Sequence, residues 1–298
     1  MKNQNILITG GTSGMGKATA QHLAKMGARL LLVGSNRTKG EAAAAELTRT
    51  TGNEAITFLQ ADLSLVREMQ RLASAIRQRF DRLDVLVHGA GGLFPPQRIV
   101  TEEGIEFTFA VQCLARYVLT NELLDLLRAA PMPKVLSIAG GGTIDKPVDF
   151  ADLQGELNHS KFGSIAKASV ANDLLSLEQM DRYADITFYN YGPGLVRTAT
   201  VVKHPLMRLI FSTIGRPFSR SAEQAAVDIM ALITGDYPSG LYGKSVQRNA
   251  PFPQVIADDA QAKLWRYCEK LAEPLIIAHE AEQMSDTATD HEPEVMVV

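Results

Sequence analysis

The chain has 298 residues, of which 46% are apolar, with a formal net charge of −3 and a pI of about 6.1. The length suits one large domain, and the apolar content is high enough for a large buried core, which excludes an intrinsically disordered chain. The slightly acidic balance argues against a nucleic-acid or anionic-membrane partner, because such partners need a basic field.

The two cysteines, Cys113 and Cys268, lie in apolar segments with helical spacing, which favours two buried thiols over a disulfide. No zinc-ligand spacing is present, so we expect no metal site. No apolar run approaches the ~18 residues that a membrane-spanning helix needs. The apolar segment NILITG begins almost at the start of the sequence, and we therefore expect no signal peptide and a cytoplasmic protein.

Short apolar runs alternate with longer segments whose apolar residues recur with the helical period. The runs predict strands at 5–9, 28–34, 55–60, 83–88, 134–139, 186–191 and 240–246. The longer segments predict helices near 14–26, 39–51, 64–79, 103–129, 162–182, 221–233 and 257–272. This order predicts an α/β fold of the Rossmann type, in which a doubly wound parallel sheet carries helices on both faces.

We interpret residues 1–275 as a single domain, because no linker, repeat or low-complexity block divides them. The polar and acidic segment 276–298 is expected to form a flexible tail. The segments 103–129 and 162–182 are apolar around most of their circumference, which indicates buried helices. They either pack inside one large core or meet a second subunit in a homodimer or homotetramer.

The strongest motif is ILITGGTSGMGKATAQHLAKMGARLLLVG, in which a strand, a glycine-rich turn, a helix and a second strand follow one another. Gly10 permits a tight turn, Gly14 lets a phosphate approach the backbone, and Gly16 lets helix and strand pack closely. The start of the helix supplies free N–H groups and a partial positive charge. The motif therefore predicts a dinucleotide site rather than a merely structural turn. The other residues of this turn in the predicted site are Thr12, Ser13 and Met15.

The spacing TGxxxGxG resembles that of the short-chain dehydrogenase/reductase family, and the resemblance covers about residues 5–273. LDVLVHGAGG at 83–92 resembles the family strand that ends beside the adenine part of the cofactor. YGPGLVRTAT at 191–200 resembles the turn that covers the nicotinamide carboxamide, and KLWRYCEKLAEP at 263–274 resembles the closing helix of retinol-dehydrogenase-like members. The resemblance implies a Rossmann fold and a nicotinamide dinucleotide cofactor.

The same resemblance implies further cofactor-binding residues. Asp62 and Leu63 match the acidic and apolar pair that meets the adenine. The remaining implied positions are Ala90, Gly91, Lys167, Pro193, Gly194, Val196 and Thr198.

The end of the second strand decides between the two nicotinamide cofactors. An NAD enzyme needs an acidic residue there to bind the ribose 2′-hydroxyl, whereas this sequence has Gly34. Ser35 and Asn36 can donate hydrogen bonds, and Arg37 can bind a 2′-phosphate, with Lys17 adding positive charge. We therefore expect NADP(H) to be preferred over NAD(H), although both basic residues also fit ordinary surface charges.

The catalytic residues depart from the family pattern. The family's reaction uses a tyrosine, a lysine four residues later, a serine and an asparagine. The tyrosine position falls on Gly163, the serine position on Gly140 and the asparagine position on Gln112. Only the lysine is retained, as Lys167, and its implied role is to hold the nicotinamide ribose. No tyrosine occurs from 118 to 182, so the loss of the proton donor does not depend on the alignment.

Two hydroxyl groups are candidates to replace the missing donors. Ser137 is close in sequence to the serine position, and Tyr191 lies at the end of a predicted strand, where such folds bind ligands. Packing in the core is the alternative role for Tyr191. Lys167 is also a candidate acid that acts through a water molecule.

The segment at about 199–221 is expected to form a lid, because the resemblance places the family's lid there and its apolar residues are mixed with basic ones. An amphipathic lid indicates a small, lipophilic substrate, and a short helix packed on the domain is the alternative.

Three functions remain open from the sequence. The first is an NADP(H)-dependent oxidoreductase whose proton path lacks the usual serine and tyrosine. The second is a non-catalytic dinucleotide-binding protein, either a sensor or a partner subunit. The third is a redox-neutral enzyme, such as an isomerase, cyclase or lyase, that uses the same pocket.

Overall fold

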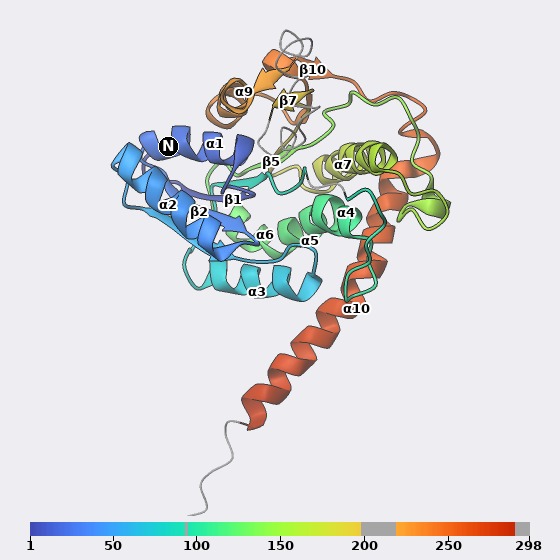
Figure 1. Cartoon of the computed structure of the whole chain (residues 1–298), viewed down its shortest axis with the longest axis horizontal. Helices are drawn as coiled ribbons and strands as arrows, with labels where there is room; N and C mark the ends of the chain where they lie inside the picture. Colours follow the sequence, from blue (N-terminus) through green and yellow to red (C-terminus); the bar gives the residue numbers. More distant parts are fainter. Residues whose placement is uncertain (93–94, 198–218, 290–298) are drawn as a thin grey trace, which may run out of the picture.

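The structure is a computed structural model that describes residues 1–92, 95–197 and 219–289. Its centre is an eight-stranded sheet with the strand order β10-β9-β6-β5-β4-β1-β2-β3 (Figure 1). Every neighbouring pair in this sheet is parallel except β9 and β10. The strands are β1 (Asn5–Thr9), β2 (Arg29–Gly34), β3 (Ile56–Gln60), β4 (Val85–His88), β5 (Lys134–Ile138), β6 (Thr187–Tyr191), β9 (Gly240–Tyr242) and β10 (Arg248–Asn249).

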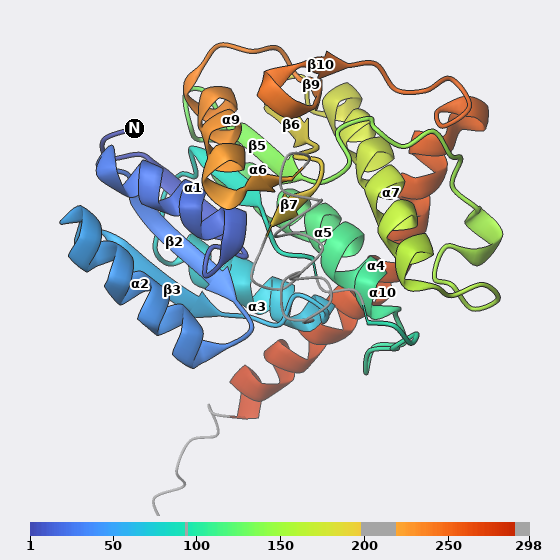
Figure 2. The same cartoon turned by 45° about the horizontal axis from the view of Figure 1, so that its top comes forward.

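Helices cover both faces of the sheet (Figure 2). One face packs on α1 (Gly14–Lys25), α2 (Arg37–Thr51) and α9 (Ala222–Thr234). The other face packs on α3 (Val66–Arg77), α5 (Ala115–Glu122) and α7 (Lys161–Arg182). Apolar residues of the strands alternate between two buried clusters, since successive side chains of a strand point to opposite faces. The predicted doubly wound α/β fold is therefore confirmed.

The predicted strands are confirmed to within one or two residues at most ends, but the prediction of one continuous helix at 103–129 was wrong. The chain forms α4 (Phe107–Phe109), a π-helical turn at Ala110–Leu114, α5, and then α6 (Leu124–Arg128). A π turn holds one extra residue per turn, and such turns occur frequently at functional sites. A short parallel pair, β7 (Val196–Arg197) and β8 (Arg220–Ser221), was not predicted.

The last helix, α10, extends from Ala260 to Thr289, well past residue 275, where the tail was expected to begin (Figure 1). Its first half packs on α7 and α3, and it buries Leu264, Trp265 and Cys268 against the apolar residues of α5 and α7. Helices α5 and α7 come from the two segments that are apolar around most of their circumference. Their burial within one chain supports packing inside one large core over contact with a second subunit. No helix among the described residues is both long and apolar enough to cross a membrane.

Candidate active site

The glycine-rich turn between β1 and α1 has the geometry that the sequence predicts. Gly10 and Gly14 have positive φ angles of 67° and 54°. A Cβ atom on Gly10 would lie 2.5 Å from the carbonyl oxygen of Gly89, and one on Gly16 would lie 2.4 Å from that of Gly10. Only glycine therefore fits at these positions. The side chain of Ser13, the N-cap of α1, makes no capping hydrogen bond, so the first N–H groups of the helix remain available to an anion.

A groove of about 160 Å³ lies beside this turn. Its walls come from the ends of β1, β4 and β5 and from the π turn and α5, which matches the ligand position expected for doubly wound sheets. The lining residues are Gly10, Ser13, Gly14, Met15, Gly16, Gly89, Ala90, Gly91, Gly92, Gln112, Arg116 and Ile138. The structure thus brings together the predicted turn, the predicted strand end at 90–91 and Gln112.

The residues predicted to determine the preference for NADP(H) over NAD(H) lie at or near the end of β2. Gly34 packs against Thr12, whose Cγ2 would lie 3.2 Å from a Cβ on this glycine. The side chain of Asn36 caps α2 by accepting a hydrogen bond from the N–H of Lys39. The two basic candidates already have acidic partners, since Lys17 lies 2.7 Å from Glu46 and Arg37 lies 2.8 Å from Glu41.

The remaining cofactor candidates occupy separate positions. Asp62 Oδ1 accepts hydrogen bonds from the N–H and the hydroxyl of Ser64, and Leu63 is buried. Ser35 is exposed, and its carbonyl oxygen accepts a hydrogen bond from Gln60. Pro193 is buried, Gly194 has a φ of 69°, and Val196 is buried in β7. Thr198 and the predicted lid, except its last residues, lie outside the described residues.

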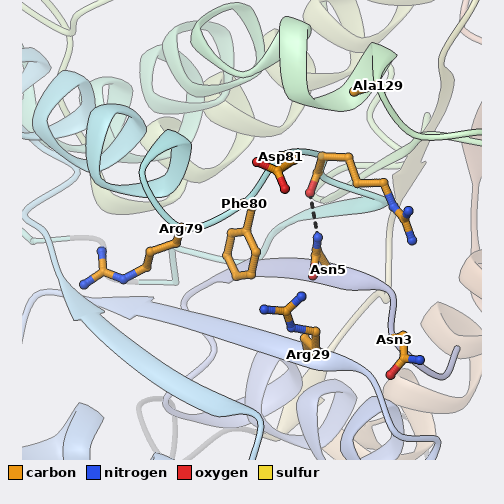
Figure 3. A pocket seen from close by; sticks show the side chains of 8 residues that line it. Asn3, Asn5, Arg29, Arg79, Phe80, Asp81 and Ala129 are labelled. Atoms are coloured by element: carbon orange, nitrogen blue, oxygen red, sulfur yellow. Dashed lines mark hydrogen bonds between the residues drawn. The ribbon is translucent and has the colours of Figure 1, made fainter.

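A second cavity, of about 390 Å³, lies at the opposite ends of the strands (Figure 3). Asn5 and Arg29, the first residues of β1 and β2, line it together with the segment Arg79–Arg82. Asn5 donates a hydrogen bond from Nδ2 to the carbonyl oxygen of Arg82 (Figure 3). Because ligands of doubly wound sheets bind at the carboxyl ends of the strands, this cavity is separate from the candidate active site.

The comparisons with known proteins place the chain in a family. Residues 4–205 match the family described as short chain dehydrogenase. The chain belongs to the short-chain dehydrogenase family. It is 27% identical to human retinol dehydrogenase 14 over 90% of this chain and 86% of the relative. It is also 31% identical to a Streptomyces protein assigned as a daunorubicin C-13 ketoreductase, over 89% of this chain and 91% of that protein.

Solved structures of other proteins share the fold. A Mycobacterium paratuberculosis protein superposes with a TM-score of 0.72 at 22% identity, over 91% of this chain and 94% of that chain. The Pseudomonas aeruginosa RhlG complex with NADP superposes with a TM-score of 0.62 at 21% identity, over 78% and 90% of the two chains. At these identities the likeness shows the fold alone.

The tyrosine of the family is absent from the groove of this short-chain dehydrogenase. Gly163 lies in the first turn of α7, where its N–H donates to the hydroxyl of Ser160. All seven tyrosines of the chain fall within the described residues, and none of them lines the groove. The groove therefore lacks a phenol as general acid.

At the family's serine position, Gly140, the carboxylate of Asp173 occupies the space that a side chain would take. A Cβ on Gly140 would lie 2.9 and 3.0 Å from the two carboxylate oxygens of Asp173 and 3.0 Å from the carbonyl oxygen of Ser169. Glycine at this position therefore leaves room for the carboxylate of Asp173, which accepts a hydrogen bond from the N–H of Gly142 at 3.0 Å. Burial raises the pKa of Asp173 to about 7.

The structure does not bring Lys167 to the groove. Its Nζ donates to the backbone carbonyl of Asp152 and lies 3.0 Å from Oδ2 of the same residue. Lys167 lines a separate small cavity together with Thr108 and Gln154. In this arrangement the lysine is engaged by the loop before α7, and its role in holding the ribose stays a prediction.

The two candidate hydroxyl groups also lie elsewhere. Tyr191 points to the face of the sheet that α9 covers, where its hydroxyl donates to Asp228 Oδ2 at 2.7 Å and accepts from Arg220 Nη1 at 2.9 Å. Burial, helped by the Asp228 carboxylate, raises the pKa of this phenol. Its expected role as a donor in the groove is therefore wrong in this structure. Ser137 is 4% exposed and pairs in register with His88, outside the groove lining.

We expect Tyr191→Phe to act on stability and not on cofactor binding. The change removes one hydrogen bond to a carboxylate but keeps the Arg220–Asp228 ion pair, so the free energy of unfolding should fall by about 1–3 kcal/mol. Urea unfolding measures the loss, and titration with NADPH measures binding. Weaker NADPH binding by more than a few-fold would show that this hydroxyl serves the groove after all.

Four residues of the groove lining, Gly89, Gly92, Arg116 and Ile138, were not among the predicted site residues, and Arg116 is the charged one among them. Arg116 of α5 is 3% exposed and lines the groove, where its Nη2 donates to the carbonyl oxygen of Ile138 at 2.8 Å. The neighbouring His88 bonds to Thr120 Oγ1 at 3.0 Å, and burial and Arg116 together lower its pKa. A basic residue inside a helix that is apolar all round was the sequence signal for this position.

Proposed function

We propose that this short-chain dehydrogenase is an NADP(H)-dependent oxidoreductase whose proton path lacks the usual serine and tyrosine. The glycine turn carries the proposal, because a Cβ on Gly10 or Gly16 would overlap backbone atoms and because the start of α1 has free N–H groups. Unpartnered donors of Gln112 and Arg116 in the same groove also fit a polar, oxygen-rich ligand.

The preference for NADP(H) over NAD(H) rests on the end of β2. Gly34 leaves no carboxylate there to repel a 2′-phosphate, and Lys17 and Arg37 lie at the starts of α1 and α2. Fold relatives crystallised with NADP or NADPH support this choice. Binding of the 2′-phosphate requires the two basic side chains to exchange Glu46 and Glu41 for the phosphate.

The absence of a tyrosine as general acid limits the substrates that can be reduced at a useful rate. The nicotinamide supplies the hydride chemistry when it is bound, while the chain binds and orients the reactants. Loss of a positioned general acid costs about 10²–10⁴ in rate, and loss of an oxyanion donor costs about 10²–10³. The substrate should therefore need little help with its proton, as an iminium or a strongly polarised enone does.

The names of the relatives support a lipophilic small molecule as the substrate. Retinol and daunorubicin, which appear in those names, are small organic molecules, and retinol is largely apolar. A cytoplasmic location and a homodimer or homotetramer remain predictions, and the second can be tested by light scattering of the purified chain.

Thermal unfolding tests the cofactor part of the proposal. A ligand at about 100 times its Kd stabilises the folded state by about 2.7 kcal/mol, so we expect saturating NADPH to raise the Tm by several degrees. At equal concentration NADH should raise the Tm less. A Tm that neither dinucleotide changes would contradict the proposal.

The second candidate function is a non-catalytic dinucleotide-binding protein. It is favoured by the engagement of Lys167 with Asp152 and by the absence of any tyrosine in the groove. The oxidation of NADPH, followed with simple ketones, retinaldehyde and an activated enone, separates the two functions. The oxidoreductase proposal expects turnover of the activated substrate alone, whereas a pure binding protein turns over none. A redox-neutral enzyme would convert its substrate without consuming NADPH.

A further inference from the structure

Arg116 is a buried cation with incomplete bonding. Only 3% of the residue is exposed, and of the side-chain nitrogen atoms only Nη2 has a hydrogen-bond partner. Nε and Nη1 are buried without a partner. A buried guanidinium normally has its N–H groups paired and its charge balanced, because water no longer solvates it.

A second unpartnered donor lies in the same wall of the groove. Gln112 stands in the π turn, one helical turn before Arg116, and its Nε2 is buried without a partner. Its Oε1 faces Gly91 on the other side, 3.1 Å from the position of a Cβ there. Both side chains line the groove, so their unpartnered donors lie in the same wall.

The neighbouring titratable groups balance the charge of Arg116 only in part, through the electrostatic attraction of Asp173. Asp173, on α7, uses Oδ2 to accept from Gly142 while its Oδ1 is itself unpartnered, so the two side chains are not hydrogen-bonded to each other. The carboxyl of Asp173 has a pKa raised to about 7 by burial, which leaves it partly neutral. His88, on β4, has a lowered pKa and adds no negative charge, and the nearby thiol of Cys113 is buried in the core.

Arg116 lies apart from the glycine turn, where a phosphate group of the dinucleotide would bind. Arg116 is tied to Ile138, the last residue of β5, and β5 lies two strands away from β1 in the sheet. Strands are about 4.8 Å apart, so the carbonyl group of Ile138 that holds Arg116 lies roughly 10 Å from the end of β1. Arg116 is therefore held on the β5 side of the groove, away from the glycine turn.

We infer that Arg116 and Gln112 form an anion-binding subsite that receives the carboxylate of an acidic, otherwise lipophilic substrate. The planar guanidinium presents a pair of N–H groups to two carboxylate oxygens, and the Gln112 amide adds a third donor. This inference rests on the proposed function, because it places the carboxylate next to a bound dinucleotide.

Benzoate and benzamide are suitable probes, because they have the same shape and differ in charge. We would titrate each into the full chain saturated with NADP⁺ and measure binding by calorimetry. Charge-assisted hydrogen bonds should make benzoate bind about 10–100 times more tightly than benzamide. Arg116→Met should abolish this difference while the Kd for NADP⁺ changes by less than about threefold.

Further variants control for folding and for general charge effects. Arg116→Met removes a buried unpaired charge, so its Tm without ligand should equal or exceed that of the wild type. If this variant does not fold, Arg116→Lys keeps the charge but loses the planar fork, and benzoate should then bind several-fold more weakly. Arg79→Met, at an exposed position after α3, should leave benzoate binding unchanged.

The outcomes distinguish a failure of the inference from a failure of the proposed function. Equal binding of benzoate and benzamide by the wild type, or no binding of benzoate, would overturn the inference while NADP⁺ binding upholds the proposed function. If Arg116→Met weakens NADP⁺ binding instead, the anion is a phosphate of the dinucleotide and the inference fails. If NADP⁺ does not bind the wild type, the proposed function fails.

Discussion

Gly34→Asp should weaken NADPH binding on the order of 100-fold while NADH binding stays equal or becomes tighter. A carboxylate at the end of β2 would lie beside the 2′-phosphate, and repulsion between them costs about 3 kcal/mol at the effective dielectric of a protein surface. The same carboxylate can bind the 2′-hydroxyl of NADH. The backbone at Gly34 allows a side chain, since its Cβ would contact Thr12 at 3.2–3.3 Å and needs only a small adjustment.

The matched control for this change is Gly34→Asn, which has the same size and no charge. Calorimetric titrations of both variants with NADPH and NADH give the four dissociation constants. The asparagine variant should retain NADPH binding to within about tenfold, because it lacks the repulsion. Equal losses of NADPH affinity in the two variants would mean that steric pressure on Thr12, and not charge, causes the effect.

Asp173→Asn should make the protein more stable at about pH 8, by up to about 4 kcal/mol. The folded-state pKa of this carboxyl is raised to about 7 from the ordinary 3.8, so the folded protein holds the proton more tightly than the unfolded chain. The favourable contribution is fully present below the ordinary pKa and is lost as the pH rises through about 7. The asparagine, which cannot ionise, still accepts the hydrogen bond from Gly142.

Urea unfolding of both proteins between about pH 4 and pH 8 measures the effect. The difference between variant and wild type should grow with pH and be smallest near the acidic end. Asp152→Asn is the matched control, because its expected effect on stability has the opposite sign. Hydrogen bonds from the Leu157 backbone, together with Lys167, lower the pKa of Asp152 to about 2, so its contribution is present at neutral pH and this variant should be less stable there. A stability gain at Asp173 that does not vary with pH would exclude ionisation as its cause.

The fold could be predicted from the sequence because its signals are local. The apolar runs of β1, β4 and β5 and the spacing of Gly10, Gly14 and Gly16 each fix a strand or a turn without reference to distant residues. The parallel arrangement follows from the alternation of strands and helices, since right-handed crossovers leave few topologies. The glycine turn that lines the groove belongs to this predictable part.

The side-chain arrangement around Arg116 and Lys167 could not be predicted, because side-chain direction there depends on distant contacts. Lys167 has the expected place in the sequence, but the loop around Asp152 turns it away from the groove. Arg116 follows a π turn, whose extra residue changes the direction in which every later side chain of the helix points. The fit of Gly140 against Asp173 likewise joins residues that no sequence spacing relates.

A crystal structure of the full chain with bound NADP⁺ tests the central claim most directly. That claim is that the nicotinamide dinucleotide lies in the glycine groove with no phenol beside its reactive ring. We predict N–H groups of Arg116 and Gln112 at that end of the groove and no tyrosine hydroxyl within hydrogen-bond distance of the nicotinamide or of a bound substrate. A tyrosine hydroxyl beside the reactive carbon, or a dinucleotide bound outside the groove, would contradict the account.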